Sequence, residues 1–128
     1  MKIEHIAIWS KDIEKLKEFY TKYFGAKCSR KYINEKRKFQ SYFLSFDEGA
    51  RIEIMQLPDL KELEDIEASY LGLAHFALSV GSEQAVDEIT HNMAQDGIKI
   101  VSQPRTTGDG YYESLVRDTE GNKVEITI

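Results

Sequence analysis

Several features that mark particular protein classes are scarce or missing in this chain of 128 residues. Cys28 is the single cysteine, which excludes an internal disulfide and favours a reducing compartment such as the cytoplasm. No uncharged apolar run approaches the ~18 residues that a membrane span requires, and the first residues contain an acid and no cleavage-type sequence of a secretory signal. A net charge of -5 supplies no basic field for phosphate backbones or anionic lipid. We therefore expect a cytoplasmic protein that binds neither nucleic acid nor membranes.

The composition that remains is typical of a single folded domain. Hydrophobic residues make up 41% of the chain and charged residues 30%, with only two prolines. A chain of 128 residues can bury one hydrophobic core but is short for two ordinary domains. We therefore predict one domain that spans residues 1–128.

The chain contains an internal repeat, which determines the architecture that we expect. Residues 5–8 read HIAI and residues 75–78 read HFAL, and both runs are typical of a first strand. After each run come a serine that can accept hydrogen bonds at a helix start, an amphipathic stretch, and a glycine suited to a left-handed helix stop. These serines and glycines are Ser10 and Gly25 in the first half and Ser82 and Gly97 in the second. Three short β-forming segments then follow each helix, so we predict an α+β fold of two tandem βαβββ modules.

The best match between the halves is their last turn and strand, EGARIEI at residues 48–54 and EGNKVEI at residues 120–126. In both halves a glycine stands four residues before the glutamate of the strand. We expect module 1 at about residues 1–57 and module 2 at about residues 73–128. The acidic connector between them, about residues 58–72, has no counterpart in either module. Its apolar residues predict a short helix or a lid, and they are Leu60, Leu63 and Ile66.

Four polar residues recur at equivalent places of the two halves: His5, Glu53, His75 and Glu125. Each points away from the apolar residues of its own strand, because successive side chains of a strand alternate between its faces. An amphipathic helix covers the apolar face of a sheet, which leaves the two histidines and two glutamates on the uncovered side. Such a set suits one divalent metal ion, with Zn²⁺, Ni²⁺, Co²⁺, Mn²⁺ and Fe²⁺ as candidates. The alternative is four ordinary polar residues on a solvated sheet face, and their recurrence in both halves favours the metal site.

Longer motifs surround these residues. They are His5-Ile6-Ala7-Ile8, Phe19-Tyr20 with Phe24-Gly25, Arg51-Ile52-Glu53-Ile54, Gly72-Leu73-Ala74-His75-Phe76-Ala77, and Arg117-Asp118-Thr119-Glu120-Gly121-Asn122-Lys123-Val124-Glu125-Ile126. With these motifs the chain resembles the vicinal oxygen chelate superfamily, which includes glyoxalases, bleomycin resistance proteins and dioxygenases, over essentially its whole length. The resemblance implies paired βαβββ units in a half-open barrel and usually a homodimer. In that family both units of one site come from one chain or from two.

Within this superfamily the chain is most similar to glyoxalase I of bacterial type, a lactoylglutathione lyase. That resemblance implies His5, Glu53, His75 and Glu125 as the four metal ligands. It also implies a substrate with two neighbouring oxygens, either a small 2-oxo or 2-hydroxy carbonyl compound or a hemithioacetal. The metal charge would stabilise an enediolate formed when a C–H proton leaves. Glu125 is then the expected proton-shuttling base, with Glu53 as the alternative.

Two positions depart from the glutathione-using glyoxalases. Trp9 stands where those enzymes have an arginine that binds a glutathione carboxylate, and Leu57 stands where they have an asparagine that assists glutathione binding. Each lost charge-assisted hydrogen bond typically costs about 1.5–3 kcal/mol. We therefore expect weak binding of glutathione adducts.

Three residues are candidates for contact with the substrate. Arg105 and Tyr112 belong to a stretch with hydroxyls and glycines, residues 103–113, in which Arg105 would anchor an anion and Tyr112 would line the cavity. The same stretch is equally a simple hairpin connection, where glycine and aspartate are expected for turn geometry alone. Trp9 either lines the pocket or packs in the core or at a subunit contact.

Three kinds of function are compatible with these residues. The first is a glyoxalase-like, metal-dependent lyase or isomerase. The second is an epimerase or a thiol-transferring resistance enzyme of the same superfamily. The third is a non-catalytic protein that binds a small molecule, against which the intact set of four ligands argues.

Overall fold

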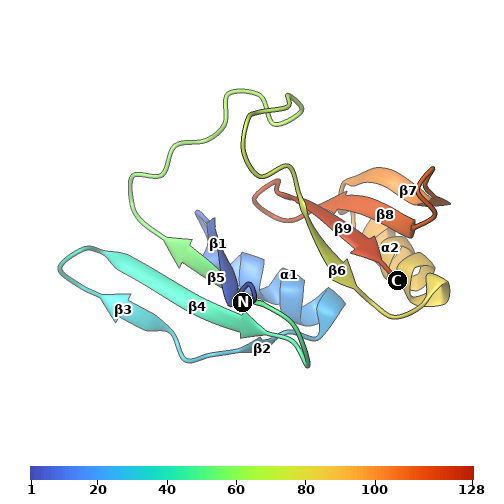
Figure 1. Cartoon of the computed structure of the whole chain (residues 1–128). Helices are drawn as coiled ribbons and strands as arrows, with labels where there is room; N and C mark the ends of the chain where they lie inside the picture. Colours follow the sequence, from blue (N-terminus) through green and yellow to red (C-terminus); the bar gives the residue numbers. More distant parts are fainter. The chain divides into compact units, whose positions relative to one another are not determined.

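The computed structural model describes residues 1–128, and the chain divides into two compact units, Met1–Leu63 and Glu64–Ile128. Each unit holds one helix and one sheet (Figure 1). The first unit contains β1 (His5–Trp9), α1 (Ile13–Phe24), β2 (Lys27–Cys28), β3 (Tyr32–Asn34), β4 (Phe39–Ser45) and β5 (Arg51–Gln56). The second contains β6 (Phe76–Ser79), α2 (Glu83–Gln95), β7 (Ile100–Thr106), β8 (Tyr112–Arg117) and β9 (Lys123–Thr127). The predicted pair of βαβββ modules is confirmed, since β2 and β3 both pair with β4 and act as one interrupted edge strand.

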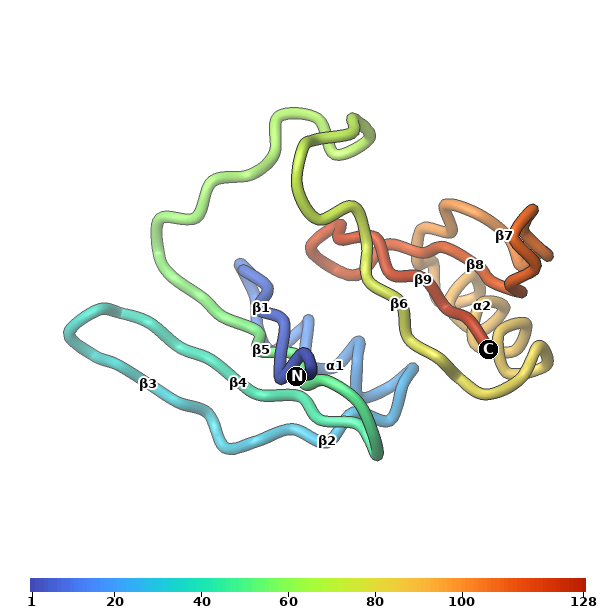
Figure 2. The backbone as a smooth tube through the Cα atoms, in the orientation of Figure 1, coloured from blue at the N-terminus to red at the C-terminus, as the bar shows by residue number.

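The two sheets share one topology. The strand order is β1-β5-β4-β2 in the first unit, with β3 also paired to β4, and β6-β9-β8-β7 in the second. In each sheet the first strand lies parallel to the last, and the other neighbours are antiparallel, a path that can be followed along the tube in Figure 2. The register places Ala7 beside Glu53 in one unit and Ala77 beside Glu125 in the other. The repeat in the sequence is therefore also a repeat in strand pairing.

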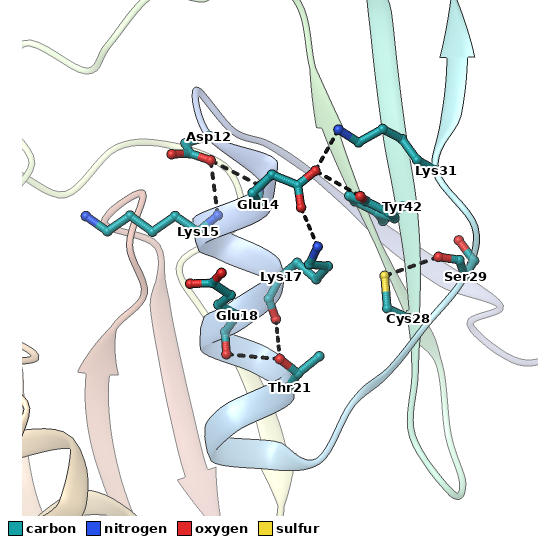
Figure 3. Close-up of polar contacts among 10 residues, drawn as sticks. All are labelled: Asp12, Glu14, Lys15, Lys17, Glu18, Thr21, Cys28, Ser29, Lys31 and Tyr42. Atoms are coloured by element: carbon teal, nitrogen blue, oxygen red, sulfur yellow. Dashed lines mark hydrogen bonds and ion pairs between the residues drawn. The ribbon is translucent and has the colours of Figure 1, made fainter.

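The two helices begin in different ways. α2 begins after Ser82, whose hydroxyl accepts a hydrogen bond from the Ala85 amide at 3.2 Å, as predicted. α1 begins after Asp12, whose carboxylate accepts from two amides of the first turn at 3.1 Å each (Figure 3). The capping role that we expected of Ser10 is thus corrected. The Ser10 hydroxyl accepts from the Asp12 amide instead, because a carboxylate stands closer to the free amides of the helix.

Each helix is followed by a glycine in the left-handed region, as predicted. The φ angle is 64° at Gly25 and 78° at Gly97, and glycine enters this region without the steric cost of a side chain. Neither helix has the length and apolar character that would be needed to cross a bilayer.

A hydrophobic core lies between the helix and the sheet of each unit. Its fully buried side chains are Ile13, Leu16, Tyr20, Leu44 and Ile54 in the first unit and Val86, Met93, Val116, Val124 and Ile126 in the second. Burial of one such side chain contributes about 1.5–3 kcal/mol. On β5 and β9 these buried residues alternate with Glu53 and Glu125, so the strand parity that we predicted for the two glutamates is confirmed.

The connector contains no helix, so one of the two structures predicted for it is wrong. Between β5 and β6 the chain forms turns, bends and irregular segments. Leu63 and Ile66 remain 63% and 43% exposed, respectively. Short helices are marginal in water unless an apolar face packs against a core, and these side chains have too little such packing.

Candidate metal centre

The first candidate pair is formed by His5 on β1 and Glu53 on β5, which are neighbouring parallel strands. The His5 Nε2 atom lies 4.0 Å from a Glu53 carboxylate oxygen, and the Glu53 side chain is only 18% exposed. The other ring nitrogen of His5, Nδ1, contacts the Glu4 carboxylate, and the Arg51 guanidinium also bonds to Glu4. A carboxylate on the far nitrogen of a histidine fixes its ring orientation, as it commonly does behind metal-binding histidines.

The second candidate pair is formed by His75, one residue before β6, and Glu125 on β9. The His75 Nε2 atom lies 3.2 Å from a Glu125 carboxylate oxygen. The Glu125 side chain is 17% exposed, while that of His75 is 45% exposed. The two pairs therefore occupy equivalent positions of the repeat, each on its own unit.

The chemistry and geometry of each pair fit a divalent metal ion. Nitrogen and oxygen ligands lie about 2.0–2.2 Å from such an ion, so two ligand atoms on one ion are about 3 Å apart. The separation of 3.2 Å in the second pair is close to this value, and the separation of 4.0 Å in the first would have to shorten by about 1 Å. Within each unit, no third His, Cys, Asp or Glu side chain completes a metal-binding group with its pair. One site shared by all four residues stays a prediction.

One aromatic ring lies against the first pair, and a second aromatic contact lies at the other end of β1. The Phe43 ring meets the His5 ring edge to face at 5.5 Å and lies under the Arg51 guanidinium at 4.2 Å. Trp9 packs edge to face against Phe39 at 6.4 Å and remains 47% exposed. Trp9 was predicted to line the pocket or to pack in the core or at a subunit contact. Its exposure excludes the core, and the other two roles stay predictions.

Charged residues surround the second pair, and sequence reasoning missed one of them. Glu113 on β8 lies near Glu125. Burial raises the pKa of Glu125 above its usual value, the negative charge of Glu113 adds to this rise, and His75 opposes it. Arg105 lies 3.7 Å from the Glu113 carboxylate and donates to the Ser102 hydroxyl at 2.6 Å. Alternation along β8 would have revealed Glu113, since its parity is opposite to that of the fully buried Ser114 and Val116.

Tyr112 lies on the other side of the same sheet. Its hydroxyl donates to the Asp87 carboxylate of α2 at 2.7 Å, and this bond raises the pKa of Tyr112. Ser114, two residues along, also points to this helix and bonds to Thr90 at 2.6 Å. Tyr112 was predicted to line the cavity, and this is corrected: it shares the face that α2 covers, because its parity is that of Ser114, whereas Glu125 lies on the opposite face.

The stretch 103–113 forms the β7–β8 hairpin, one of its two predicted roles. The Thr107 amide donates to the Tyr111 carbonyl at 2.8 Å, and Gly110 adopts a left-handed φ of 91° in the turn. Arg105 is therefore held on a strand and not on a loose loop. Its contact with a substrate stays a prediction.

A sequence model described as the Glyoxalase/Bleomycin resistance protein/Dioxygenase superfamily matches residues 2–126. The chain belongs to this superfamily. The fold agrees, since the crystal structure of glyoxalase I from Zea mays superposes with a TM-score of 0.80 over 98% of the chain, at 23% identity. The resemblance inferred from the motifs is thereby confirmed.

Two curated relatives are similar in sequence. Lactoylglutathione lyase GLX1 of Arabidopsis thaliana is 26% identical over 95% of the chain, and the uncharacterized protein YwkD of Bacillus subtilis (strain 168) is 35% identical over 68%. The chain spans 42% of the plant lyase and 44% of the maize structure, and it aligns with 68% of the Bacillus protein. The similarity to glyoxalase I is therefore distant, and two of these relatives are more than twice the length that the chain matches.

Proposed function

We propose that this chain is a glyoxalase I-like, metal-dependent lyase or isomerase. Its substrate would be a small 2-oxo or 2-hydroxy carbonyl compound or a hemithioacetal. The observation that supports this most directly is the presence of one His–Glu pair at the same place of each repeat, with nitrogen and oxygen 4.0 Å and 3.2 Å apart. Membership of the superfamily and the distant similarity to lactoylglutathione lyase support the same class of reaction.

The residues proposed to hold the metal are His5, Glu53, His75 and Glu125. When bound, a divalent ion such as Zn²⁺, Ni²⁺, Co²⁺, Mn²⁺ or Fe²⁺ would supply positive charge to the substrate oxygens that become negative during proton transfer. The imidazoles would supply nitrogen ligands, and the two carboxylates would offset the charge of the ion. The Glu4 carboxylate behind His5 would keep that ring in its binding orientation.

Glu125 is the group proposed to accept and return the substrate proton, with Glu53 as the alternative. Both carboxylates are largely buried, at 17% and 18% side-chain exposure, which shields a proton in transit from bulk water. Arg105 is proposed to bind an anionic group of the substrate, since its guanidinium is already held by Ser102 and Glu113 on the same unit. Tyr112 is left out of this proposal because of its place beneath α2.

The substrate is proposed to differ from a glutathione adduct. Trp9 and Leu57 replace two polar groups that bind glutathione in the enzymes that the chain resembles. Trp9 is a half-exposed ring beside Phe39, which favours an apolar part of a substrate over a carboxylate. We also propose that residues 1–128 act as one domain in a cytoplasmic homodimer; the exposed, unpaired Cys28 agrees with a reducing compartment.

The test is a metal and substrate titration with a matched histidine control. Purified protein is analysed for bound metal, and turnover is measured with hemithioacetals of methylglyoxal and a panel of thiols, with and without Ni²⁺ or Zn²⁺. We expect metal-dependent turnover that falls sharply in His75→Ala and is unchanged in His91→Ala, which removes an exposed histidine of α2.

Each alternative gives a different outcome. A metal-loaded protein that converts no adduct contradicts the lyase reaction and favours an epimerase or a thiol-transferring enzyme. A protein that binds small molecules equally well with and without metal favours a non-catalytic binding module. A protein that retains no metal contradicts the proposed centre itself.

A further inference from the structure

One part of the connector is tied to the second unit by a buried arginine. Arg117, the last residue of β8, is only 7% exposed. Its guanidinium donates to the carbonyl of Gly121 and to the carbonyl of Ile66, both at 2.7 Å, and pairs with the Glu67 carboxylate at 3.2 Å. We call residues 64–70 of the connector the strap. The strap also bonds to itself, as the Tyr70 hydroxyl accepts from the Asp65 amide at 3.1 Å.

The surface under the strap is the β8–β9 turn, residues 118–122. The Asp118 carboxylate accepts from the amides of Glu120 and Asn122 at 2.9 Å each, which makes this turn a rigid support. The Ile66 side chain lies on Gly121. A Cβ atom added to Gly121 would come within 2.0 Å of Ile66 Cδ1 and 3.0 Å of Ile66 Cγ1.

The equivalent turn of the first unit has no such cover. Gly49 and Gly121 each stand four residues before the glutamate of their strand, and their φ angles are 87° and 86°. A Cβ atom added to Gly49 would meet nothing within 4 Å. The two glycines therefore share their backbone conformation, and contact with the strap distinguishes them.

The strap contact joins two chain segments, one that leads to His75 and one that leads to Glu125. Ile66 precedes His75 by nine residues, and Gly121 precedes Glu125 by four. By bonding to both carbonyls, Arg117 fixes these two segments to each other. Of the two pairs, the one behind the strap has its nitrogen and oxygen 3.2 Å apart, and the pair of the first unit has them 4.0 Å apart.

We infer that Arg117 is a positioning residue, which holds the strap on the β8–β9 turn so that His75 and Glu125 stand at the separation that one metal ion requires. The inference rests on the proposed metal centre. Arg117 and Ile66 touch no ligand directly and act through the chain segments that they fix. Because residues behind metal ligands commonly change metal affinity by 10–100-fold when they are replaced, we expect a loss of roughly tenfold without the strap.

The main test replaces Arg117 by methionine, which keeps the length of the side chain and removes its donors. Amide exchange of the metal-free full chain, read by mass spectrometry, should show faster exchange over residues 64–75 than in wild type. The dissociation constant for Co²⁺ should rise roughly tenfold, and the visible absorption of bound Co²⁺ should change because its ligand geometry is altered. Arg30→Met, which replaces an exposed arginine, should leave all three readouts unchanged.

A second set of variants keeps the test decisive if Arg117→Met does not fold. Gly121→Ala and Gly49→Ala impose the same left-handed strain, and only the first also displaces Ile66. We expect weaker Co²⁺ binding and faster strap exchange in Gly121→Ala than in Gly49→Ala. Ile66→Ala combined with Gly121→Ala should return both to the level of Gly49→Ala, because the smaller side chain leaves room for the added methyl group and only the backbone strain remains.

Two results would overturn the inference, and they differ. If the strap exchanges faster in these variants while Co²⁺ affinity and absorption stay as in wild type, the positioning role is wrong and the proposed metal centre stands. If the wild-type chain binds no Co²⁺, the proposed function fails and the positioning role fails with it.

Discussion

The two units share a backbone plan and differ in what surrounds the same pair of residues. In the first unit the antiparallel strand partner of Glu53 is Phe43, whose ring meets the His5 ring and lies under the Arg51 guanidinium. In the second unit the strand partner of Glu125 is Leu115, and a second carboxylate, Glu113, lies close by. The two sheets thus present the same ligand types in unlike surroundings.

This difference suggests a division of labour between the repeats. Strand pairing fixes where the four candidate ligands lie, and it is the same in both units. The neighbours differ, since an aromatic ring meets His5 in the first unit and a second carboxylate, Glu113, lies near Glu125 in the second. We therefore expect the first unit to contribute ligands and apolar contact and the second to contribute proton transfer and charge recognition.

The largest expected effect comes from exchanging each glutamate for its amide. Glu125→Gln should lower kcat by about 10²–10⁴-fold, the usual contribution of a positioned acid or base, in protein saturated with metal. Glu53→Gln should weaken metal binding but lower kcat much less under the same saturation. Steady-state rates measured together with metal content separate the two effects. Equal losses of kcat in both variants would contradict the division of labour.

Core truncations come next in size and test whether the units fold together. Leu16→Ala in α1 and Met93→Ala in α2 each empty a fully buried site, so each should lower the free energy of unfolding by about 2–5 kcal/mol. Leu63→Ala, at a side chain that is 63% exposed, serves as the control and should change it by less than about 0.5 kcal/mol.

The shape of the unfolding curve in urea then tests the predicted single domain. If residues 1–128 unfold as one cooperative domain, both truncations shift one common transition. If each truncation shifts only one of two separate transitions, the two units fold independently and the single-domain prediction is wrong.

Most of the fold could be predicted from the sequence because the chain repeats itself. Apolar alternation on β5 and β9 and the glycine after each helix were sufficient to place the two glutamates on the uncovered face. The start of α1 was misplaced, since Ser10 and Asp12 are both good caps and only the local backbone path decides between them. A repeat thus predicts the elements that both halves share better than it predicts which of two neighbouring residues caps a helix.

The surroundings of the candidate site were less predictable. The hairpin of residues 103–113 was among the expected structures, but its β7–β8 pairing contains irregular register shifts that no sequence pattern indicates. Alternation along β8 does put Tyr112 on the face of Ser114 and Glu113 on the opposite face, but only once the limits of that strand are known. The strap could not be predicted for a different reason: it depends on a hydrogen bond from Arg117 to a backbone carbonyl 51 residues away in the sequence.

The smallest expected effect concerns the acid dependence of stability in the first unit. Glu14, at the start of α1, bonds to Lys17, Lys31 and Tyr42, and these partners lower its pKa from 4.5 to about 2 (Figure 3). A carboxyl whose pKa is lowered by folding stabilises the fold at any pH above its pKa in the unfolded chain. This stabilisation disappears as the pH falls from about 4.5 towards about 2. Because the side chain is 45% exposed, we expect about 1 kcal/mol or less.

The measurement is urea unfolding of wild type and Glu14→Gln across this pH range, with Glu18→Gln, an exposed position of the same helix, as control. The difference between wild type and Glu14→Gln should be largest at neutral pH and shrink in acid. In the metal-free protein, Glu125→Gln should raise the free energy of unfolding at neutral pH, whereas Glu14→Gln should lower it. Burial and Glu113 raise the pKa of Glu125, so its ionisation costs stability as the pH rises, and the amide should be the more stable form at neutral pH. If both substitutions changed the free energy of unfolding at neutral pH in the same direction, the electrostatic contrast between Glu14 and Glu125 would be wrong.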